Sequence, residues 1–592
     1  MLDIQFSNRF ELLAELLAAR IGVRRGSAFD SDVVLVPSSA IRRRLTLDIA
    51  RSHRICANLQ FGYLAQWLWQ QLARFDPRIG AESPFDQATL TWHAYAAFGD
   101  PAWYGRWPRL SAYVRHADDR MRFELARQVA GAFSHYVTYR TDWLQAWQQG
   151  HSADPAGSLG QDEPWQQALW QRIATALSLE PVNPLLAFAR SLQTRALPQE
   201  AFPNPVHIFC LPDIAPLHLE LLRALAQHGD LYLYALNPCA EYWFDVVDPR
   251  RLAYLQAAGR LDHHQVGHRL LAGWAKQSQA HLRQLVETTE FDLAEAAFHP
   301  SDSPQLLGRL QDSILHLQEL APGSVPMKAG DRSLEVHVCH SRSRELEVLH
   351  DRLLGLFREY PDLSPDQILV VTPDLQATAP LIDAVFGTAP RERHIPYQIT
   401  GLARSILNPA ASALLALLDL AGSRWLLSDV LGLLEKAPIC SRLNLDRDAL
   451  EGVRTWLRDA GVRWGLDDSH RAALGLPPSA AHSFQDGLDR LFLGYALPDG
   501  WAQPFAGLLP AGAVQGGRAS WLGAVWQFIA SLRSLREELG SLRTAAQWAD
   551  FYLETTRRFI DERDSPEDFH ELLAVLDAFG RQSDGQGIDT LE

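Results

Sequence analysis

The chain opens with LDIQFSNR (residues 2–9), and an apolar-periodic segment then leads to a second apolar run, VVLVP (33–37). A similar stretch, LEVHVCHSRSRE (334–345), leads through another helical pattern to ILVVTP (368–373). Each stretch predicts a strand, a polar turn, a helix and a second strand, which is the βαβ unit that builds parallel sheets. The recurrence of this unit predicts an α/β chain with two lobes.

The turn between a strand and the following helix is where phosphates bind in nucleotide-hydrolysing folds. A P-loop wraps the phosphates in the backbone amides of a glycine-rich turn. The turns expected here, Ser7-Asn8-Arg9 and Ser341 to Arg344, contain serine and arginine but no glycine. The sequence therefore predicts the architecture of a two-lobed nucleotide motor without its phosphate-binding loop.

Lysine usage supports the same prediction. A P-loop also needs a lysine directly after a glycine. The chain has only three lysines, and none of them follows a glycine: Lys276, Lys328 and Lys436. The predicted strand that begins at Val206 is followed by Asp213-Ile214, where a motor would carry Asp-Glu to hold Mg²⁺. We therefore expect no ATP hydrolysis and no resident cofactor in this chain.

Composition and charge narrow the class of protein. The 592 residues carry a net charge of −15, but residues 1–140 hold 18 Arg, no Lys and 13 acidic residues, which gives +5. A basic N-terminal part is where nucleic acid would bind, although a solvated arginine-rich surface explains the composition equally well. No apolar run approaches the ~20 residues of a membrane span. The strand-like start predicts no signal peptide, and five scattered cysteines predict no disulfide framework. A cytoplasmic protein is expected.

Strand and helix signals divide the chain into four parts. Alternating patterns predict α/β lobes, and long helical patterns predict an insertion in each lobe, so helices dominate overall. Strands are expected at 206–211 and 231–236 around a helix at 216–227, and the stretch 295–332 is expected to be a linker. The predicted parts are lobe one (1–90 and 196–330), its helical insertion (91–195), lobe two (331–405) and the helical insertion of lobe two (406–592).

Three polar clusters have residue types that can bind metal ions or act in catalysis. Asp262-His263-His264 with His268 offers imidazoles at close spacing, but the cluster lies in a polar, glycine-flanked stretch that favours a solvated loop. Asp118-Asp119 and Asp467-Asp468 are sequence neighbours, whose side chains point apart on a helix or strand. We predict surface positions for both pairs, and no catalytic or metal-binding residue.

The nucleic-acid signal lies near the start of the chain. Arg42, Arg43 and Arg44 follow the turn after the second strand, which places them at the carboxyl edge of the sheet, where open α/β folds bind ligands. Guanidinium groups suit phosphates and guanine edges. Tyr63 and Trp69 offer rings for stacking on unpaired bases. Trp67 is expected to be a core residue, whereas Trp69 falls on another face of the same predicted helix.

Several motifs resemble the RecC family, the gamma chains of bacterial exodeoxyribonuclease V (RecBCD). They occur in the family's order from residue 7 to about residue 500, and a weaker colinear match follows. The matching stretches are SNR (7–9), NPCAEYW (237–243) with Asp248-Pro249, HVCHS (337–341) with RELEVLHDRL (344–353), AVFG (384–387) with Ala389-Pro390, RWG (463–465) with Asp467-Asp468, and LGYA (493–496).

The resemblance implies a fold like a superfamily-one helicase whose motor motifs have decayed. It also implies a scaffold that bridges a helicase–nuclease beta chain (RecB) and a second helicase, the alpha chain (RecD), which use ATP and Mg²⁺. Such a chain acts in recombinational repair of double-strand breaks. It receives forked duplex DNA, guides the separated strands and scans the 3′-ended strand for the Chi sequence.

Carried over by position, the resemblance places Chi reading on Ser39, Trp69 and Arg140. The chain departs from the family where Pro37 and Arg43 replace glutamines, so the sequence that it reads is expected to differ or be lost. Family members also continue past residue 592 through the rest of lobe two and a nuclease-like domain. That domain is expected to be absent here.

Two other functions remain open on the residues alone. One is an active ATP-dependent helicase in which Arg9 or Arg344 takes the place of the missing lysine. The other is a protein–protein adaptor that makes no contact with DNA. An ATPase assay with single-stranded DNA separates the first from a non-catalytic subunit, and substitution of Trp69 and Arg140 tests the second.

Overall fold

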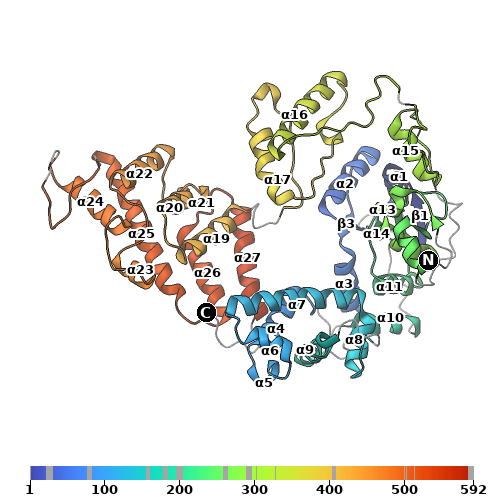
Figure 1. Cartoon of the computed structure of the whole chain (residues 1–592), viewed down its shortest axis with the longest axis horizontal. Coiled ribbons are helices and arrows are strands. Elements are labelled where there is room, and N and C mark those ends of the chain that lie inside the picture. The colour runs from blue at the N-terminus through green and yellow to red at the C-terminus, as the bar shows by residue number, and fades with distance from the viewer. Residues whose placement is uncertain are drawn as a thin grey trace. The chain divides into compact units, whose positions relative to one another are not determined.

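The computed structural model describes residues 2–21, 31–76, 83–154, 160–177, 184–194, 205–257, 265–288, 297–301, 303–326, 328–402, 408–498, 501, 503–512 and 514–583. The chain divides into two compact units, Met1–Cys339 and His340–Glu592 (Figure 1). Among the described residues, no helix is both long and apolar enough to cross a membrane.

Unit 1 is built on a five-stranded sheet whose strands are all parallel. Their order is β1-β5-β4-β2-β3, so β3 is an edge strand. The predicted strands at the N-terminus, at 206–211 and at 231–236 are confirmed, as is the helix between the last two. The strands are β1 (Leu2–Ser7), β2 (Asp32–Leu35), β3 (Leu59–Gly62), β4 (Val206–Phe209) and β5 (Leu231–Leu236).

Helices cover both faces of the sheet. Successive strand residues point to opposite sides, so neighbouring residues of one strand pack against different helices. Val34 and Phe209 belong to a buried cluster with residues of α1 (Phe10–Ile21) and α2 (Ser39–His53). Leu35, next to Val34, instead belongs to the large cluster formed with α3 and α11. Covering helices on two faces are what a parallel sheet requires. The bounds of the second pair are α3 (Leu64–Phe75) and α11 (Pro216–Ala226).

The helical pattern predicted for 91–195 is confirmed within the described residues. A buried carboxylate ties two of its helices together, since Glu163 accepts hydrogen bonds from Trp147 Nε1 (2.9 Å) and Ser152 Oγ (2.7 Å). The helices are α4 (Gln87–Phe98), α5 (Pro101–Tyr104), α6 (Pro108–Val114), α7 (Asp119–Tyr139), α8 (Thr141–Gln148), α9 (Glu163–Ala176) and α10 (Pro184–Thr194).

The stretch 295–332 is not the simple linker that its Pro, Ser and Gly content predicted. It contains α15 (Leu306–Leu315), and Ala297 pairs with Ser7 at the end of β1. The interpretation as a linker was wrong there because polar residues at both ends concealed an amphipathic helix. Other elements of unit 1 are α12 (Pro249–Ala257), α13 (Arg269–Trp274), α14 (Lys276–Thr288), β6 (Val246–Val247) and β7 (Gln265–Val266).

Unit 2 is helical in its described residues, as predicted from about residue 405 onward. Its large apolar cluster contains the fully buried Trp425 and Phe484. The α-helices are α16 (Arg342–Glu359), α17 (Leu375–Ile382), α19 (Pro409–Ala421), α20 (Leu427–Leu434), α21 (Ala437–Arg442), α22 (Arg447–Asp459), α23 (Asp468–Ala473), α24 (Phe484–Ala496), α25 (Ala519–Leu539), α26 (Ala545–Phe559) and α27 (Pro566–Ser583).

The second βαβ unit is only partly formed. The helix after Ser341 is present, and Ser341 caps it by accepting a hydrogen bond from Arg344 N (3.2 Å). The flanking segments 334–339 and 368–373 form no strand, so the prediction of two strands there is wrong for this structure. An isolated segment gains no ladder hydrogen bonds, and its apolar side chains stay exposed: Val338 is 94% exposed and Leu369 is 87% exposed.

We expect Val338→Thr and Leu369→Thr to change the free energy of unfolding by less than about 0.5 kcal/mol each, because neither side chain is buried. The same substitutions should reduce self-association, since exposed apolar patches drive association. Urea unfolding and light scattering of the chain measure the two effects. Leu353→Thr in the buried part of α16 is the contrasting variant and should be clearly destabilising. Destabilisation of more than about 1 kcal/mol by Val338→Thr would show that its segment is packed in solution.

Candidate nucleic-acid interface

The turn between β1 and α1 corresponds to the position of a P-loop, and here another segment of the chain lies against it. Ser7 Oγ donates to Ala297 O (2.7 Å) and accepts from Arg9 N (3.1 Å). Asn8 donates to His299 O (2.7 Å) and accepts from His299 N (3.0 Å). The Arg9 guanidinium donates to Pro300 O. The polar groups of this turn are thus bonded to segment 297–300.

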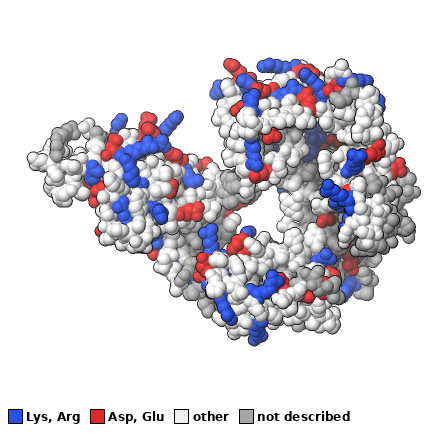
Figure 2. All heavy atoms as spheres, in the orientation of Figure 1, with Lys and Arg blue, Asp and Glu red and all other residues white. Residues whose placement is uncertain are grey.

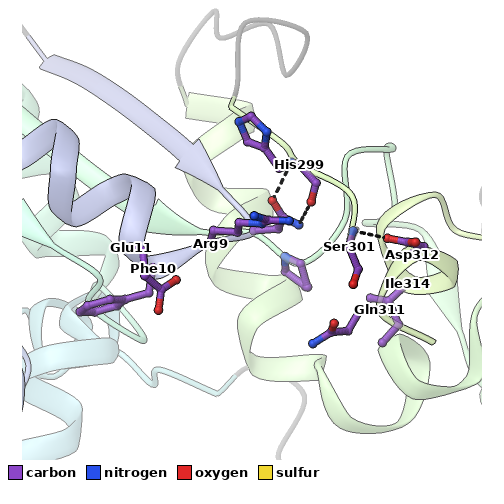
Figure 3. A pocket seen from close by; sticks show the side chains of 10 residues that line it. Arg9, Phe10, Glu11, His299, Ser301, Gln311, Asp312 and Ile314 are labelled. Atoms are coloured by element: carbon purple, nitrogen blue, oxygen red, sulfur yellow. Dashed lines mark hydrogen bonds between the residues drawn. The ribbon is translucent and has the colours of Figure 1, made fainter. Parts of the chain in front are cut away.

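A pocket of about 450 Å³ lies beside this turn and is shown in Figure 3. Arg9 lines it, but so do the carboxylates of Glu11 and Asp312, and Asp312 accepts a hydrogen bond from Ser301 N (2.6 Å). Carboxylates repel a triphosphate. The pocket therefore lacks the electrostatics of a phosphate site.

Asp213, at the position where a motor would carry a magnesium-binding carboxylate, contacts two side chains of the protein instead. Asp213, after β4, accepts a hydrogen bond from Tyr139 Oη (3.0 Å), and His281 Nδ1 lies 4.0 Å from its other oxygen. Burial, with the Asp213 carboxylate beside it, raises the pKa of Tyr139. Burial lowers the pKa of His281 despite the nearby carboxylate, so that this imidazole is neutral at pH 7. Asp213 thus joins the end of α7 to the sheet.

Three loops meet at the carboxyl edge of the sheet. The segments after β2, β3 and β4 leave neighbouring parallel strands, and Val36 N donates to Gly62 O (3.0 Å) between the first two. Tyr63 follows β3, and the bond from Tyr139 to Asp213 brings the end of α7 to the loop after β4. This edge is the usual ligand side of an open α/β sheet. We refer to these three loops and the end of α7 as the carboxyl-edge site.

The turn after β2 presents the predicted serine and arginines to solvent. Ser38 caps α2 by accepting from Ile41 N (3.3 Å), which leaves Ser39 exposed as the first helical residue. Three exposed arginines follow on α2. They are Arg42, Arg43 and Arg44. The Arg42 guanidinium lies over the Phe61 ring at 5.7 Å, and Arg44 forms an ion pair of 2.7 Å with Asp48. All three lie near the start of α2, the helix that follows β2.

Of the two aromatic residues predicted to stack on bases, Tyr63 is exposed and Trp69 is buried. Tyr63 is 50% exposed at the start of α3. Trp67 is 6% exposed, which confirms its predicted place in the core. Trp69 is also 6% exposed and lies edge-on to Phe85 at 6.4 Å, so the prediction of an open stacking face is wrong here. Phe85 in turn stacks on Trp170 of α9, so this side of α3 is covered by other residues of unit 1.

Arg140 lies between α7 and α8 and is exposed. Its guanidinium lies over the Trp143 ring at 5.2 Å. The hydrogen bond from neighbouring Tyr139 to Asp213 holds the end of α7 at the loop after β4. Arg140 thus follows the residue that joins α7 to this loop, whereas Trp69 lies in the core.

The three polar clusters of His and Asp residues have structural roles wherever the structure describes their residues. His268 is buried and bonded to Ser313 Oγ (3.1 Å), so the prediction of a solvated loop is wrong at this residue. Asp262, His263 and His264 lie outside the described residues. Asp118 and Asp467 cap α7 and α23. Within the described ranges, no group of three His, Cys, Asp or Glu side chains is placed to hold a metal ion.

Charge does not mark the site by itself. On the face shown in Figure 2, Lys and Arg side chains are interspersed with Asp and Glu side chains. Four glutamines that the sequence pattern did not single out lie together on β3 and α3: Gln60, Gln66, Gln70 and Gln71. The spacing of Gln66 and Gln70 on one face of α3 was the available signal.

Comparisons with known proteins agree with the motifs. The family model "RecC, N-terminal domain" matches residues 2–317, and "RecBCD enzyme subunit RecC fourth domain" matches residues 407–591. Proteins named RecBCD enzyme subunit RecC are similar to 93% of this chain: that of Escherichia coli K12 at 30% identity over 52% of its own length, that of Haemophilus influenzae at 28% over 53%, and that of Mycolicibacterium smegmatis at 29% over 51%. The chain spans about half the length of these curated relatives. With one family model covering more than half of it, the chain belongs to the RecC family.

Proposed function

We propose that this chain is a non-catalytic subunit of a RecBCD-type helicase–nuclease, in which degenerate helicase-like lobes hold and guide separated DNA strands. The observation that supports this most directly is the β1–α1 turn, whose Ser7, Asn8 and Arg9 are bonded to segment 297–300. A working P-loop needs free backbone amides and a lysine at this place. A chain that keeps the lobe but fills the phosphate site is suited to binding DNA without stepping along it.

The proposed partners are a helicase–nuclease beta chain and a second helicase, the alpha chain, which would use ATP and Mg²⁺. The printed names of the relatives, RecBCD enzyme subunit RecC, support membership of such a complex. The proposal places the chain in the cytoplasm at the nucleoid, in recombinational repair of double-strand breaks. Its DNA ligands are a forked duplex and the 3′-ended strand that is scanned for Chi.

The carboxyl-edge site supplies suitable groups for an unpaired strand. The exposed Tyr63 ring can stack on a base, and the exposed guanidinium of Arg140 can bind a phosphate. The Ser39 hydroxyl and the α2 arginines Arg42, Arg43 and Arg44 lie on the neighbouring turn and helix. Trp69 takes no part in this arrangement because it is buried.

Tyr63→Ala is expected to weaken binding of a labelled 20-mer of oligo-dT about 5-fold or more, because one base–aromatic stack contributes about 1–3 kcal/mol. Arg140→Ala should lower the slope of log K against log salt by about 0.7, the value for one phosphate contact on a single strand. Fluorescence anisotropy across a salt series measures both. Tyr254→Ala and Arg309→Ala, exposed positions on α12 and α15, are the matched controls. Equal losses in the control variants would contradict a site at the carboxyl edge.

The first alternative is an active helicase whose phosphate site uses Arg9 or Arg344. Arg9 donates to Pro300 O, and Arg344 forms an ion pair of 2.8 Å with Glu347, so both guanidinium groups are already engaged. We expect no ATP turnover by the chain with single-stranded DNA. Turnover that is lost in Arg9→Ala or Arg344→Ala would establish the helicase instead.

The second alternative is an adaptor that makes no contact with DNA. It predicts that Tyr63→Ala and Arg140→Ala leave DNA binding unchanged both in the chain and in complexes that co-purify with helicase–nuclease partners. The open ring of Tyr63 at a ligand edge favours the DNA-guiding function over the adaptor.

A further inference from the structure

A second concave site lies on the flank of the unit 1 sheet. It is a groove of about 380 Å³ between the edge strand β3, its neighbour β2 and helix α3. This volume falls in the range of about 300–1,000 Å³ that small-ligand sites occupy. We call it the glutamine groove; its lining residues are Ser31, Val33, Leu35, Gln60, Phe61, Gly62, Tyr63, Gln66, Trp67, Gln70, Gln71, Arg74 and Val206.

Four amides converge on this groove from two elements. Gln66 and Gln70 lie one turn apart on α3, Gln71 follows, and Gln60 comes from β3. Gln60, Gln66 and Gln70 are exposed and Gln71 is half-buried. None of the four side chains has a hydrogen-bond partner among the described residues. Each amide therefore has both a donor and an acceptor available to a ligand.

The charge and the apolar parts of the groove restrict the ligand further. No carboxylate is among the lining residues, and Arg74 adds a positive charge. A metal ion or a cationic ligand is therefore disfavoured, and an anionic ligand is favoured. Tyr63 lies at one end, and Arg74 lies about three helical turns, roughly 16 Å, farther along α3. The groove thus combines an open aromatic ring, amides and a guanidinium along a length of one to a few nucleotides.

We propose that the glutamine groove binds an unpaired adenine of single-stranded DNA. A glutamine amide matches adenine because its oxygen accepts from the N6 amino group while its nitrogen donates to a ring nitrogen. Tyr63 would contact a neighbouring base and Arg74 a flanking phosphate. This inference rests on the proposed function, since it assumes that the chain holds single-stranded DNA, and it adds a preference for one base in a groove that shares Tyr63 with the carboxyl-edge site.

The test compares labelled 12-mers of oligo-dA and oligo-dT by fluorescence anisotropy, with the complete chain and the variant Gln66→Met/Gln70→Met. Methionine keeps the unbranched shape of glutamine, and both positions are exposed, so folding should be unaffected. The matched control is Gln148→Met/Gln277→Met, which changes two exposed glutamines of α8 and α14. Comparing the two double variants cancels the intrinsic stacking of oligo-dA, because both bind the same probes.

We expect the groove variant to reduce the ratio of oligo-dA to oligo-dT affinity by about 5-fold or more, the effect of losing one bidentate base contact. Oligo-dT affinity should stay within 2-fold (about 0.4 kcal/mol) of the control. An unchanged ratio with intact oligo-dT binding would overturn the adenine site but leave the proposed function standing. If the complete chain bound neither probe, both the adenine site and the proposed function would be contradicted. An unchanged ratio would leave the groove as a surface for a partner chain, for example a strand that pairs with the β3 edge.

Discussion

Replacing Trp69 with alanine is expected to lower the free energy of unfolding by about 3–5 kcal/mol, the usual cost of removing a large aromatic side chain from a core. Trp69 is 6% exposed and packs against Phe85, which in turn stacks on Trp170 with ring centroids 5.4 Å apart. These contacts connect α3 to α9. Urea unfolding followed by circular dichroism measures the loss.

Trp274→Ala is the matched control for this prediction. Trp274 is 84% exposed on α13, so its removal should change the free energy of unfolding by less than about 0.5 kcal/mol. Trp69→Phe should cost less than Trp69→Ala because part of the ring volume is kept. Unchanged stability of Trp69→Ala together with lost binding to single-stranded DNA would contradict the prediction. It would show that the Trp69 ring is exposed in solution and stacks on DNA bases, as the family resemblance implies.

Acidification from pH 7.5 to pH 5 is expected to destabilise unit 1, with a contribution of about 2 kcal/mol from His207 alone. His207 is fully buried on β4, where its Nδ1 lies 3.2 Å from Tyr234 Oη. Burial, assisted by the positive charge of Arg20, lowers its pKa to about 4. Below pH 6.5 the unfolded chain binds a proton that the folded chain rejects, so stability is complete above pH 6.5 and falls toward pH 4.

His207→Phe removes the titrating group but keeps an aromatic ring between the neighbouring tyrosines. The pH-dependent part of the loss should shrink by about 2 kcal/mol in this variant, whatever its stability at pH 7.5. Burial also lowers the pKa of His218, to about 4, and that of His281, so part of the acid sensitivity will remain. Urea unfolding at the two pH values gives the comparison. An identical pH dependence in the wild type and the variant would show that His207 is protonated in the folded chain.

Local patterns were sufficient for the parallel sheet of unit 1 but not for the second predicted βαβ unit, whose flanking segments 334–339 and 368–373 form no strand. Runs such as VVLVP at 33–37 are apolar on both faces, which requires helices on both sides of the strand. The absence of glycine and lysine from Ser7-Asn8-Arg9 is visible without any structure. The edge strand β3 was missed because it has only four residues, too few to show a clear alternation.

Errors arose where a distant segment decides the environment of a side chain. Trp69 falls on a different face of α3 from Trp67, and sequence periodicity marked that face as open. Phe85, which stacks on Trp170 of α9, covers that face, so both rings are buried. His268 was assigned to a solvated loop by its polar neighbours, yet it packs against Ser313 of α15, far along the chain.

The sequence by itself determined that this chain is an α/β protein of the RecC family and that the turn after its first strand lacks the P-loop pattern, because strand periodicity, glycine and lysine are local properties. Only the tertiary structure showed that segment 297–300 is bonded to the β1–α1 turn, that Tyr139 joins the end of α7 to Asp213, and that four glutamines line one groove. These features depend on contacts between residues that are far apart in the chain, and hydrogen bonding and burial are decided by such contacts rather than by residue type.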